Sequence, residues 1–154
     1  MALRRFFSLM TQIGLDTRVK TPLPVRVFIV EDSPVFRERL AEEITEHRNL
    51  ELIGTADKET EAISAVSVSP PDLMFVDINL LEGNGLNVVR EVRRTLPKSK
   101  LSIVMMTNHA SPTFRRESLK LGADYFIDKS IEFERIPAIL DAFANSGVKG
   151  RLKH

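Results

Sequence analysis

Side chains able to handle phosphate or a metal ion stand at the ends of four apolar runs of the chain. Glu31 and Asp32 directly follow VRVFIV, and Asp77 ends DLMFVD, with no basic residue beside any of these carboxylates. Thr107 follows LSIVMM, and Lys129 follows DYFID. Carboxylate oxygens suit Mg²⁺, whereas a threonine hydroxyl and a lysine ammonium can each bind a phosphoryl oxygen. The residue types therefore predict phosphate chemistry on a bound Mg²⁺, provided that the fold brings the four run ends together.

The apolar runs have the length and composition of buried β-strands. They occupy residues 25–30, 50–56, 72–77, 101–106 and 124–128. Most positions in them are apolar, as in a parallel sheet covered on both faces, and amphipathic helical stretches separate them. We therefore predict an α/β fold, a doubly wound five-stranded parallel sheet of flavodoxin-like strand order 2-1-3-4-5 with helices on both faces. In that order a cleft opens at the carboxyl ends of the first and third strands, where Asp32 and Asp77 stand.

Each of these polar residues, taken alone, has a common structural explanation. An acidic residue after a strand is often a helix cap, a lone lysine is usually a solvated surface charge, and a lone threonine often bonds to the backbone. The occurrence of all of them at successive strand ends favours the functional interpretation.

Capping residues mark where the helices begin and end. Ser33 and Ser111 are each followed by proline, a frequent first residue of a helix, and Gly122 ends the second of these helices. Asp57 and Asn84 are the predicted caps of the two helices between them. The residues predicted to face the core from the first helix are Val35, Phe36, Leu40 and Ile44. In the last helix, Pro137 is expected either to lie near the first turn or to kink the helix. The predicted inward face of this helix is Phe133, Ile136, Ile139, Leu140 and Phe143.

The composition excludes several classes of function. The 154 residues are 43% hydrophobic, enough for one core, and the net charge of +1 provides no field that would attract nucleic acid or anionic lipid. The absence of cysteine excludes disulfides and thiol catalysis. No run approaches the roughly 20 apolar residues of a membrane span. We therefore predict a cytoplasmic protein with no membrane span and no direct nucleic-acid binding.

Three segments are predicted along the chain. Residues 1–24 form a flexible N-terminal tail with a proline-containing linker, residues 25–145 form the domain, and residues 146–154 form a short C-terminal tail. Apolar residues of the first tail stand at helical spacing, namely Leu3, Phe6, Phe7 and Met10. They could form an amphipathic helix, but a frayed tail with the true start at Met10 is the favoured interpretation. The C-terminal tail is too short for an output module, so a stand-alone domain is expected.

Four motifs at the strand ends resemble those of response-regulator receiver domains of bacterial two-component systems, the chemotaxis receiver among them. The motifs are VFIVEDSP, LMFVDINL, IVMMTN and GADYFIDKS, and their spacings are similar to those of the family over residues 25 to about 145. The resemblance implies that Asp77 accepts a phosphoryl group and that Thr107 and Lys129 assist at the phosphoryl oxygens. It also implies a Mg²⁺ site formed by Glu31, Asp32, Asp77 and the backbone carbonyl of Asn79.

The resemblance further implies the partners of the domain. The donor would be a histidine kinase or a phosphotransfer protein, and the chain would have only intrinsic phosphotransfer and slow autodephosphorylation. The output face would consist of the helix that begins at residue 112, the strand over 124–128 and the last helix, with a phosphorylation-dependent homodimer as one outcome. Candidate contacts on it are Arg115, Arg116 and Lys120, although a solvated basic face is the commoner explanation for such residues. Phe126 corresponds to the switch aromatic of the family, and simple core packing is the alternative.

Three other functions compete with this interpretation. A degenerate receiver would keep the fold as a docking module without accepting phosphate, but the acidic set is complete. A phosphatase or phosphomutase with an aspartate nucleophile would normally carry a second carboxylate two residues after Asp77, where Asn79 stands. A flavin-binding protein would need a glycine-rich or hydroxyl-rich phosphate loop, whereas the loop after the first strand is acidic. Gly83 and Gly85 are predicted to serve turn geometry.

Overall fold

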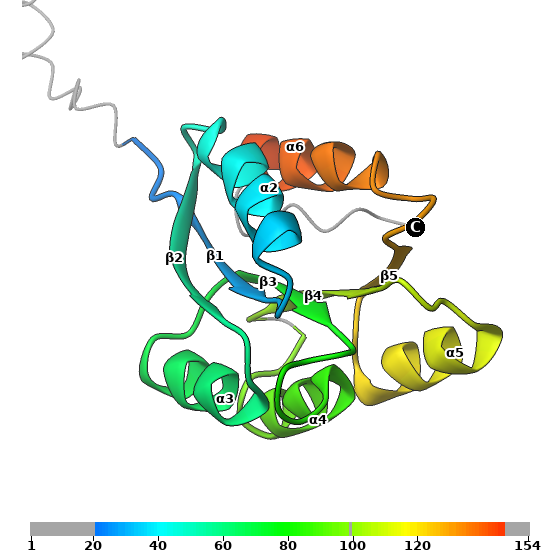
Figure 1. Ribbon diagram of the computed structural model, residues 1–154. Helices are drawn as coiled ribbons and strands as arrows, with labels where there is room; N and C mark the ends of the chain where they lie inside the picture. The colour runs from blue at the N-terminus through cyan, green and yellow to red at the C-terminus, as the bar shows by residue number, and fades with distance from the viewer. Residues whose placement is uncertain (1–20, 99, 147–154) are drawn as a thin grey trace, which may run out of the picture.

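Five parallel strands form the sheet at the centre of the computed structural model, which describes residues 21–98 and 100–146 (Figure 1). The strands are β1 (Val25–Val30), β2 (Leu50–Ala56), β3 (Leu73–Asp77), β4 (Ser102–Thr107) and β5 (Tyr125–Asp128). Their order across the sheet is β2-β1-β3-β4-β5, and every neighbouring pair is parallel. The flavodoxin-like order predicted from the sequence is confirmed.

One helix follows each strand. The helices are α2 (Pro34–Thr45), α3 (Glu59–Val68), α4 (Gly85–Thr95), α5 (Pro112–Leu121) and α6 (Arg135–Ser146). Figure 1 shows α2 and α6 on one face of the sheet and α3, α4 and α5 on the other, which confirms the prediction of helices on both faces. The helices α2, α3, α4 and α5 each cross back between parallel strands. All the strand-to-helix loops therefore lie at one edge of the sheet.

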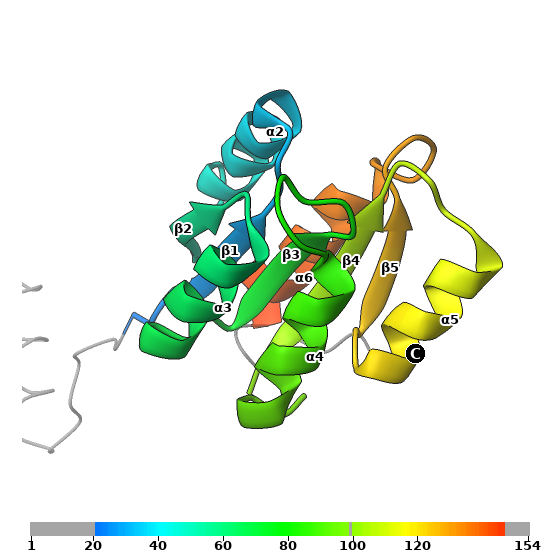
Figure 2. The same cartoon turned by 60° about the horizontal axis from the view of Figure 1, so that its bottom comes forward.

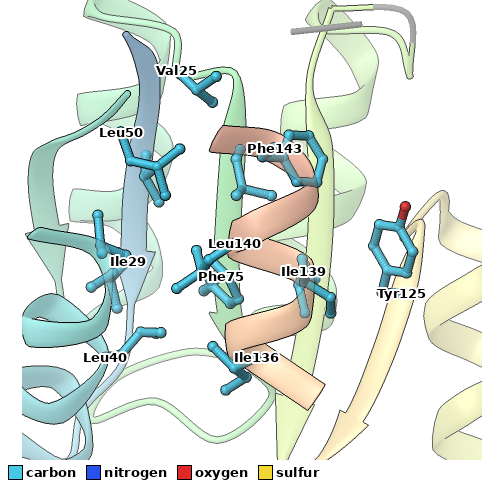
Figure 3. Packing of buried hydrophobic residues seen from close by; sticks show 14 of the residues in the cluster. Val25, Ile29, Leu40, Leu50, Phe75, Tyr125, Ile136, Ile139, Leu140 and Phe143 are labelled. Carbon is cyan, nitrogen blue, oxygen red and sulfur yellow. The ribbon is translucent and has the colours of Figure 1, made fainter. Parts of the chain in front are cut away.

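Side chains on the two faces of the strands enter two separate hydrophobic clusters. Ile29 and Phe75 belong to the first cluster, where Leu140 of α6 packs against the sheet (Figure 3). Their neighbours Val30 and Met74 point to the opposite face and belong to the second cluster, with α3 and α4. The strands are therefore apolar at nearly every position because both faces are buried. This double burial holds the carboxyl ends of the strands in a fixed relation to one another.

Most of the predicted helix caps are present. The side-chain oxygens of Ser33, Asn84 and Ser111 accept hydrogen bonds from amides in the first turns of α2, α4 and α5. Gly122 follows α5 in the left-handed conformation, with a φ of 110°. Three of the loops that carry site residues or support them therefore lead into helices whose starting points are encoded locally.

The predicted cap of α3 is wrong. Lys58, not Asp57, holds the cap position, and it makes no side-chain cap hydrogen bond. The amide of Glu59 donates instead to the carbonyl oxygen of Glu82 at 2.9 Å. A carbonyl group in the loop after β3 thus accepts the hydrogen bond that a capping side chain would otherwise accept from this first-turn amide.

Val35 does not face the core, contrary to the prediction. Its exposed fraction is 78%, whereas Leu40 and Ile44 are buried and Phe36 is half-buried against the first cluster. Phe36, Leu40 and Ile44 recur at every fourth position and so share one face of α2. Val35 lies about 100° from Phe36 around the helix axis, which turns its side chain outward.

The sequence predicts that Phe133 lines the inward face of the last helix, but this residue lies before that helix begins. Because α6 starts at Arg135, Phe133 lies in the segment before the helix, although it packs against the same cluster as Ile136 and Leu140. Pro137 lies in the first turn, the first of the two expected outcomes. The amides of a first turn have no partner within the helix, so the missing N–H of proline costs no helical hydrogen bond there.

Within residues 21–98 and 100–146, no helix is long enough and apolar enough to cross a membrane. The apolar residues at helical spacing near the start of the chain, and most of both predicted tails, lie outside the described residues.

Candidate functional site

The carboxyl ends of the strands meet at one edge of the sheet, where α2 begins and the loops after β3 and β5 lie (Figure 2). Glu31 and Asp32 follow β1 directly, and Asp77 is the last residue of β3. One carboxylate oxygen from each of these three residues lies within 4.8 Å of the other two. Glu31 and Asp77 are buried, while Asp32 is half-buried. The structure therefore brings together the three acidic side chains that the sequence predicts to share a site.

Lys129 lies between two of these carboxylates. Its Nζ atom is 2.7 Å from Oε2 of Glu31 and 2.9 Å from Oδ2 of Asp77, and only 2% of its side chain is exposed. No base stands beside the acidic residues along the chain, but the fold places this ammonium among them because β5 ends at the same edge. Three carboxylates and one ammonium leave a net negative charge when all are ionised, which favours a bound cation.

Burial raises the pKa of Glu31 to about 7. The charge of Asp77 acts in the same direction, while hydrogen bonds from Lys129 and from the amide of Ser33, 3.0 Å from Oε1, lower the pKa and offset part of the effect. A carboxyl group with this pKa is partly protonated near neutral pH. Because a carboxylate must lose its proton to bind a metal, cation binding is expected to weaken below about pH 7.

We expect the stability of the metal-free protein to fall as the pH rises through the range in which Glu31 ionises. Its pKa is raised from 4.5 to about 7 by folding, so its contribution is complete below 4.5 and is lost as the pH passes about 7. The loss is at most about 3 kcal/mol. Urea denaturation across this range measures the free energy of unfolding, and Glu31→Gln should flatten the fall. An equal pH dependence in both proteins would contradict the expected role of Glu31.

Thr107 is buried at the end of β4, beside the acidic residues in the sheet. Asp77 pairs in register with Met106, the residue before Thr107, and the amide of Lys129 donates to the carbonyl oxygen of Thr107 at 2.9 Å. The hydroxyl oxygen Oγ1 accepts a hydrogen bond from the amide of His109 at 3.1 Å. A hydroxyl that accepts in this way keeps its own hydrogen for donation, which is the property that the sequence predicts for this residue.

Asn79 supports the carboxylate of Asp77 from the loop after β3. Its backbone amide donates to Oδ1 of Asp77 at 3.2 Å, while the ammonium of Lys129 donates to the other oxygen, Oδ2. Both carboxylate oxygens therefore have a donor. These two bonds fix the orientation of the carboxylate. The coordinating role expected of the Asn79 carbonyl oxygen stays a prediction.

Two glycines shape the loop after β3. Gly83 has a φ of 86°, in the left-handed region that favours glycine. Gly85 approaches the end of β3 so closely that an added Cβ atom would lie 2.0 Å from the carbonyl oxygen of Asp77. Both glycines therefore serve backbone geometry, as predicted, and the second allows α4 to start directly against the strand that carries Asp77.

Gly85→Ala is expected to lower the free energy of unfolding by about 2 to 3 kcal/mol, since only a backbone shift can relieve the overlap with β3. Gly54→Ala is the matched control, because its Cβ atom would meet the ring of Phe28, at 2.9 Å, and not backbone. A side chain yields more easily than a strand, so the control should lose less stability. Urea denaturation of the two variants measures the difference, and an equal loss would contradict this explanation.

Phe126 is buried, with 3% of its surface exposed, and belongs to the second hydrophobic cluster. The guanidinium carbon of Arg115 lies 4.9 Å from the centroid of its ring, and Arg115 also pairs with Glu132 at 3.6 Å. Core packing, one of the two alternatives for Phe126, describes the present conformation. Its role as a switch stays a prediction. The two other candidate contacts, Arg116 and Lys120, are exposed on α5.

Phe36 has a contact with the site that the sequence does not predict. Helical periodicity identifies it only as a core residue, yet the centroid of its ring lies 4.1 Å from Nζ of Lys129. The sequence feature that could have indicated this contact is the position of Phe36 in the first turn of the helix that begins just after Glu31 and Asp32.

The family model described as response regulator receiver domain matches residues 27–141. Among curated proteins, the transcriptional regulatory protein CitB of Klebsiella pneumoniae is 28% identical over 120 residues, which cover 78% of this chain and 50% of that protein. A protein-glutamate methylesterase/protein-glutamine glutaminase 2 of Vibrio vulnificus is 33% identical over 108 residues, which cover 70% of this chain and 31% of that protein. The chain thus spans half the length of one relative and about a third of the other.

A solved structure agrees with the match at the level of the whole fold. The signal receiver domain of NarL from Mycobacterium tuberculosis superimposes with a TM-score of 0.68 at 26% sequence identity. The superposition covers 80% of this chain and 98% of that domain.

Proposed function

The chain belongs to the response regulator receiver domains of two-component systems, and from this premise we propose that Asp77 accepts a phosphoryl group in a signalling switch. The observation that carries the proposal is the position of Asp77, which lies beside two further carboxylates and 2.9 Å from the ammonium of Lys129. Such a set combines a nucleophile, a cation site and a positive charge for the phosphoryl oxygens. The proposed donor is the phosphohistidine of a histidine kinase or of a phosphotransfer protein.

Asp77 is the proposed nucleophile. One of its carboxylate oxygens attacks phosphorus and forms a P–O bond as the P–N bond to the protonated donor ring breaks, and the electron pair of that bond stays on the imidazole nitrogen. Lys129 neutralises charge on the transferred oxygens. Thr107, whose hydroxyl oxygen accepts from the amide of His109, donates its hydrogen to a phosphoryl oxygen. The product is an acyl phosphate, which hydrolyses, so the signal decays unless it is renewed.

The proposed ligands of Mg²⁺ are Glu31, Asp32, Asp77 and the backbone carbonyl of Asn79. Three carboxylates with oxygens within 4.8 Å of one another provide the hard donors and the negative charge that this ion prefers, so the residues fit it. When bound, Mg²⁺ supplies positive charge that neutralises the transferring oxygens.

Incubation with Mg²⁺ and a small acyl phosphate tests the proposal. The intact mass should increase by one phosphoryl group, and removal of Mg²⁺ with a chelator should prevent the increase. An unchanged mass, under conditions that phosphorylate a known receiver domain, would refute the proposal and favour a docking module with the same fold. Turnover of a phosphate ester at roughly 1 per second or faster would favour the phosphatase alternative instead.

The proposed output face consists of α5, β5 and α6. The guanidinium carbon of Arg115 on α5 lies 4.9 Å from the centroid of the Phe126 ring on β5. A change in the position of Phe126 would therefore alter this contact with the exposed helix. Movement of Thr107 toward a phosphoryl group would disturb β5, the neighbouring strand. A downstream protein or a second copy of this chain would bind the altered face, where Arg116 and Lys120 are exposed. Action without an attached output domain and a cytoplasmic location stay predictions.

A further inference from the structure

Lys129 is contacted on a further side by an aromatic ring. Beyond its two carboxylate partners, its ammonium lies 4.1 Å from the centroid of the Phe36 ring. Phe36 in turn packs edge to face with Phe133, with ring centroids 5.4 Å apart and ring planes at 85°. The guanidinium carbon of Arg39 lies 3.7 Å from the centroid of Phe133. We refer to Phe36, Phe133 and Arg39 as the aromatic ladder.

The aromatic ladder is anchored at both ends. Phe36 lies in the first turn of α2, where its amide donates to Oγ of Ser33 at 3.4 Å, and Arg39 follows on the same helix. Phe133 comes from the segment between β5 and α6, shortly after Lys129, and packs against the first hydrophobic cluster. The ring of Phe36 is therefore held through its own backbone and through its edge-to-face contact with Phe133. Neither α2 nor the segment after β5 can move without disturbing this arrangement.

The contact is important because the ammonium has little access to water. Only 2% of the Lys129 side chain is exposed, and the attraction between a cation and an aromatic face is stronger at such a desolvated position than at the surface. The ring attracts the charge without requiring the directional geometry of a hydrogen bond. An ammonium on such a face can therefore exchange a carboxylate oxygen for a phosphoryl oxygen and stay in place. An aliphatic side chain would fill the same space without this attraction.

We propose that Phe36 is a positioning residue for phosphoryl transfer, acting through Lys129. Its ring holds the ammonium where Nζ bridges Glu31 and Asp77 and can reach the oxygens of an incoming phosphoryl group. The reaction itself rests on the proposed function, whereas the placement of Lys129 by the ring can be measured without it.

Fluorinated phenylalanines at position 36 of the full chain test the proposal. Successive fluorine atoms weaken the negative face of the ring but change its shape little, so the attraction for Lys129 decreases in steps. With Mg²⁺ and saturating acyl phosphate, the phosphorylation rate should fall in the same steps, by about tenfold for the most fluorinated ring. The donor concentration at half the maximal rate should change little, because the ring does not bind the donor. A rate that is independent of fluorination overturns the proposal.

Phe143 of α6 provides the matched control. It is buried in the same hydrophobic cluster, and among the described residues no cation lies over its ring, so its fluorination should change the rate by less than about twofold. Phe36→Leu should slow the reaction as much as the most fluorinated ring, and Phe36→Tyr, which keeps the negative face, should restore most of the rate. Equal slowing by fluorination of Phe143 would assign the effect to core packing and overturn the proposal.

Hydrogen exchange at the Lys129 ammonium gives a measurement that requires no phosphorylation. In protein with isotope-labelled lysine, NMR should show the Nζ hydrogens exchanging with water faster at each step of fluorination, by up to about tenfold, because the ammonium leaves its carboxylate partners more often. If the wild-type protein accepts no phosphoryl group, this result decides the question. Stepwise acceleration then supports placement by Phe36 and leaves only the proposed function refuted, whereas unchanged exchange overturns the placement.

Discussion

Asp77→Asn is expected to abolish the uptake of a phosphoryl group from a small acyl phosphate. The amide of asparagine is a far weaker nucleophile than a carboxylate and cannot form the acyl phosphate. The substitution keeps the size of the side chain, and the contact of Lys129 with Glu31, at 2.7 Å, does not depend on it. After incubation with Mg²⁺ and the donor, the intact mass should stay unchanged for Asp77→Asn and rise by one phosphoryl group for the wild type.

Asp57→Asn is the matched control for this experiment. Asp57 is a half-buried carboxylate at the same edge of the sheet, directly after β2, and its variant should gain mass as the wild type does. Phosphorylation that persists in Asp77→Asn would place the acceptor elsewhere, and loss in both variants would indicate a general effect of removing a carboxylate. The charge of Asp77 raises the pKa of Glu31, so that pKa should be lower in Asp77→Asn, which NMR titration can check.

Lys129→Met is expected to slow phosphorylation by about a hundredfold, comparable to the loss of a group that stabilises charge in a transition state. Methionine keeps the length and the apolar stem of the side chain but removes the ammonium that lies 2.9 Å from Asp77. The transferred oxygens then lose a cation that neutralises them. The time course of the intact mass with acyl phosphate and Mg²⁺ measures the rate. A rate equal to that of the wild type would show that the charge of Lys129 is not needed.

Lys129→Met also changes the titration of Glu31. The hydrogen bond from Lys129 lowers the pKa of Glu31 and opposes the effect of burial, so the pKa should rise beyond about 7 in the variant. A protonated carboxyl group is neutral, and so the variant avoids an unpaired buried charge on Glu31 and is expected to stay folded near neutral pH. NMR of the Glu31 carboxyl carbon measures this shift independently of phosphorylation.

Two further variants separate the charge of Lys129 from general effects. Lys58→Met removes a lysine that pairs with Glu82 at 3.1 Å at the start of α3, with 31% of its side chain exposed, and should change the rate by less than about twofold. Lys129→Arg keeps the charge but should restore only part of the rate. A planar guanidinium needs more room than an ammonium and presents its donors in a fixed fork, which does not match the position between Glu31 and Asp77.

Local patterns in the sequence were sufficient to predict the fold and the acidic part of the site. Continuous apolar runs separated by amphipathic helices require a parallel sheet covered on both faces, and the loops after parallel strands must lie at one edge. That rule alone predicts the convergence of Glu31, Asp32 and Asp77. Ser33 and Ser111 marked helix starts in the same way, because a cap acts on amides only two or three residues away.

The tertiary structure alone decided which groups touch one another within the site. The bonds from Lys129 to Glu31 and to Asp77 join residues 98 and 52 positions apart in the chain. The helical periodicity predicts that Phe36 faces the core. Only the packing of α2 against the segment after β5 places its ring against Lys129. Helix capping and helical periodicity involve residues that are only a few positions apart, so both can be recognised in the sequence itself. Contacts between side chains of different elements depend on how the layers pack together, and no local pattern encodes that packing.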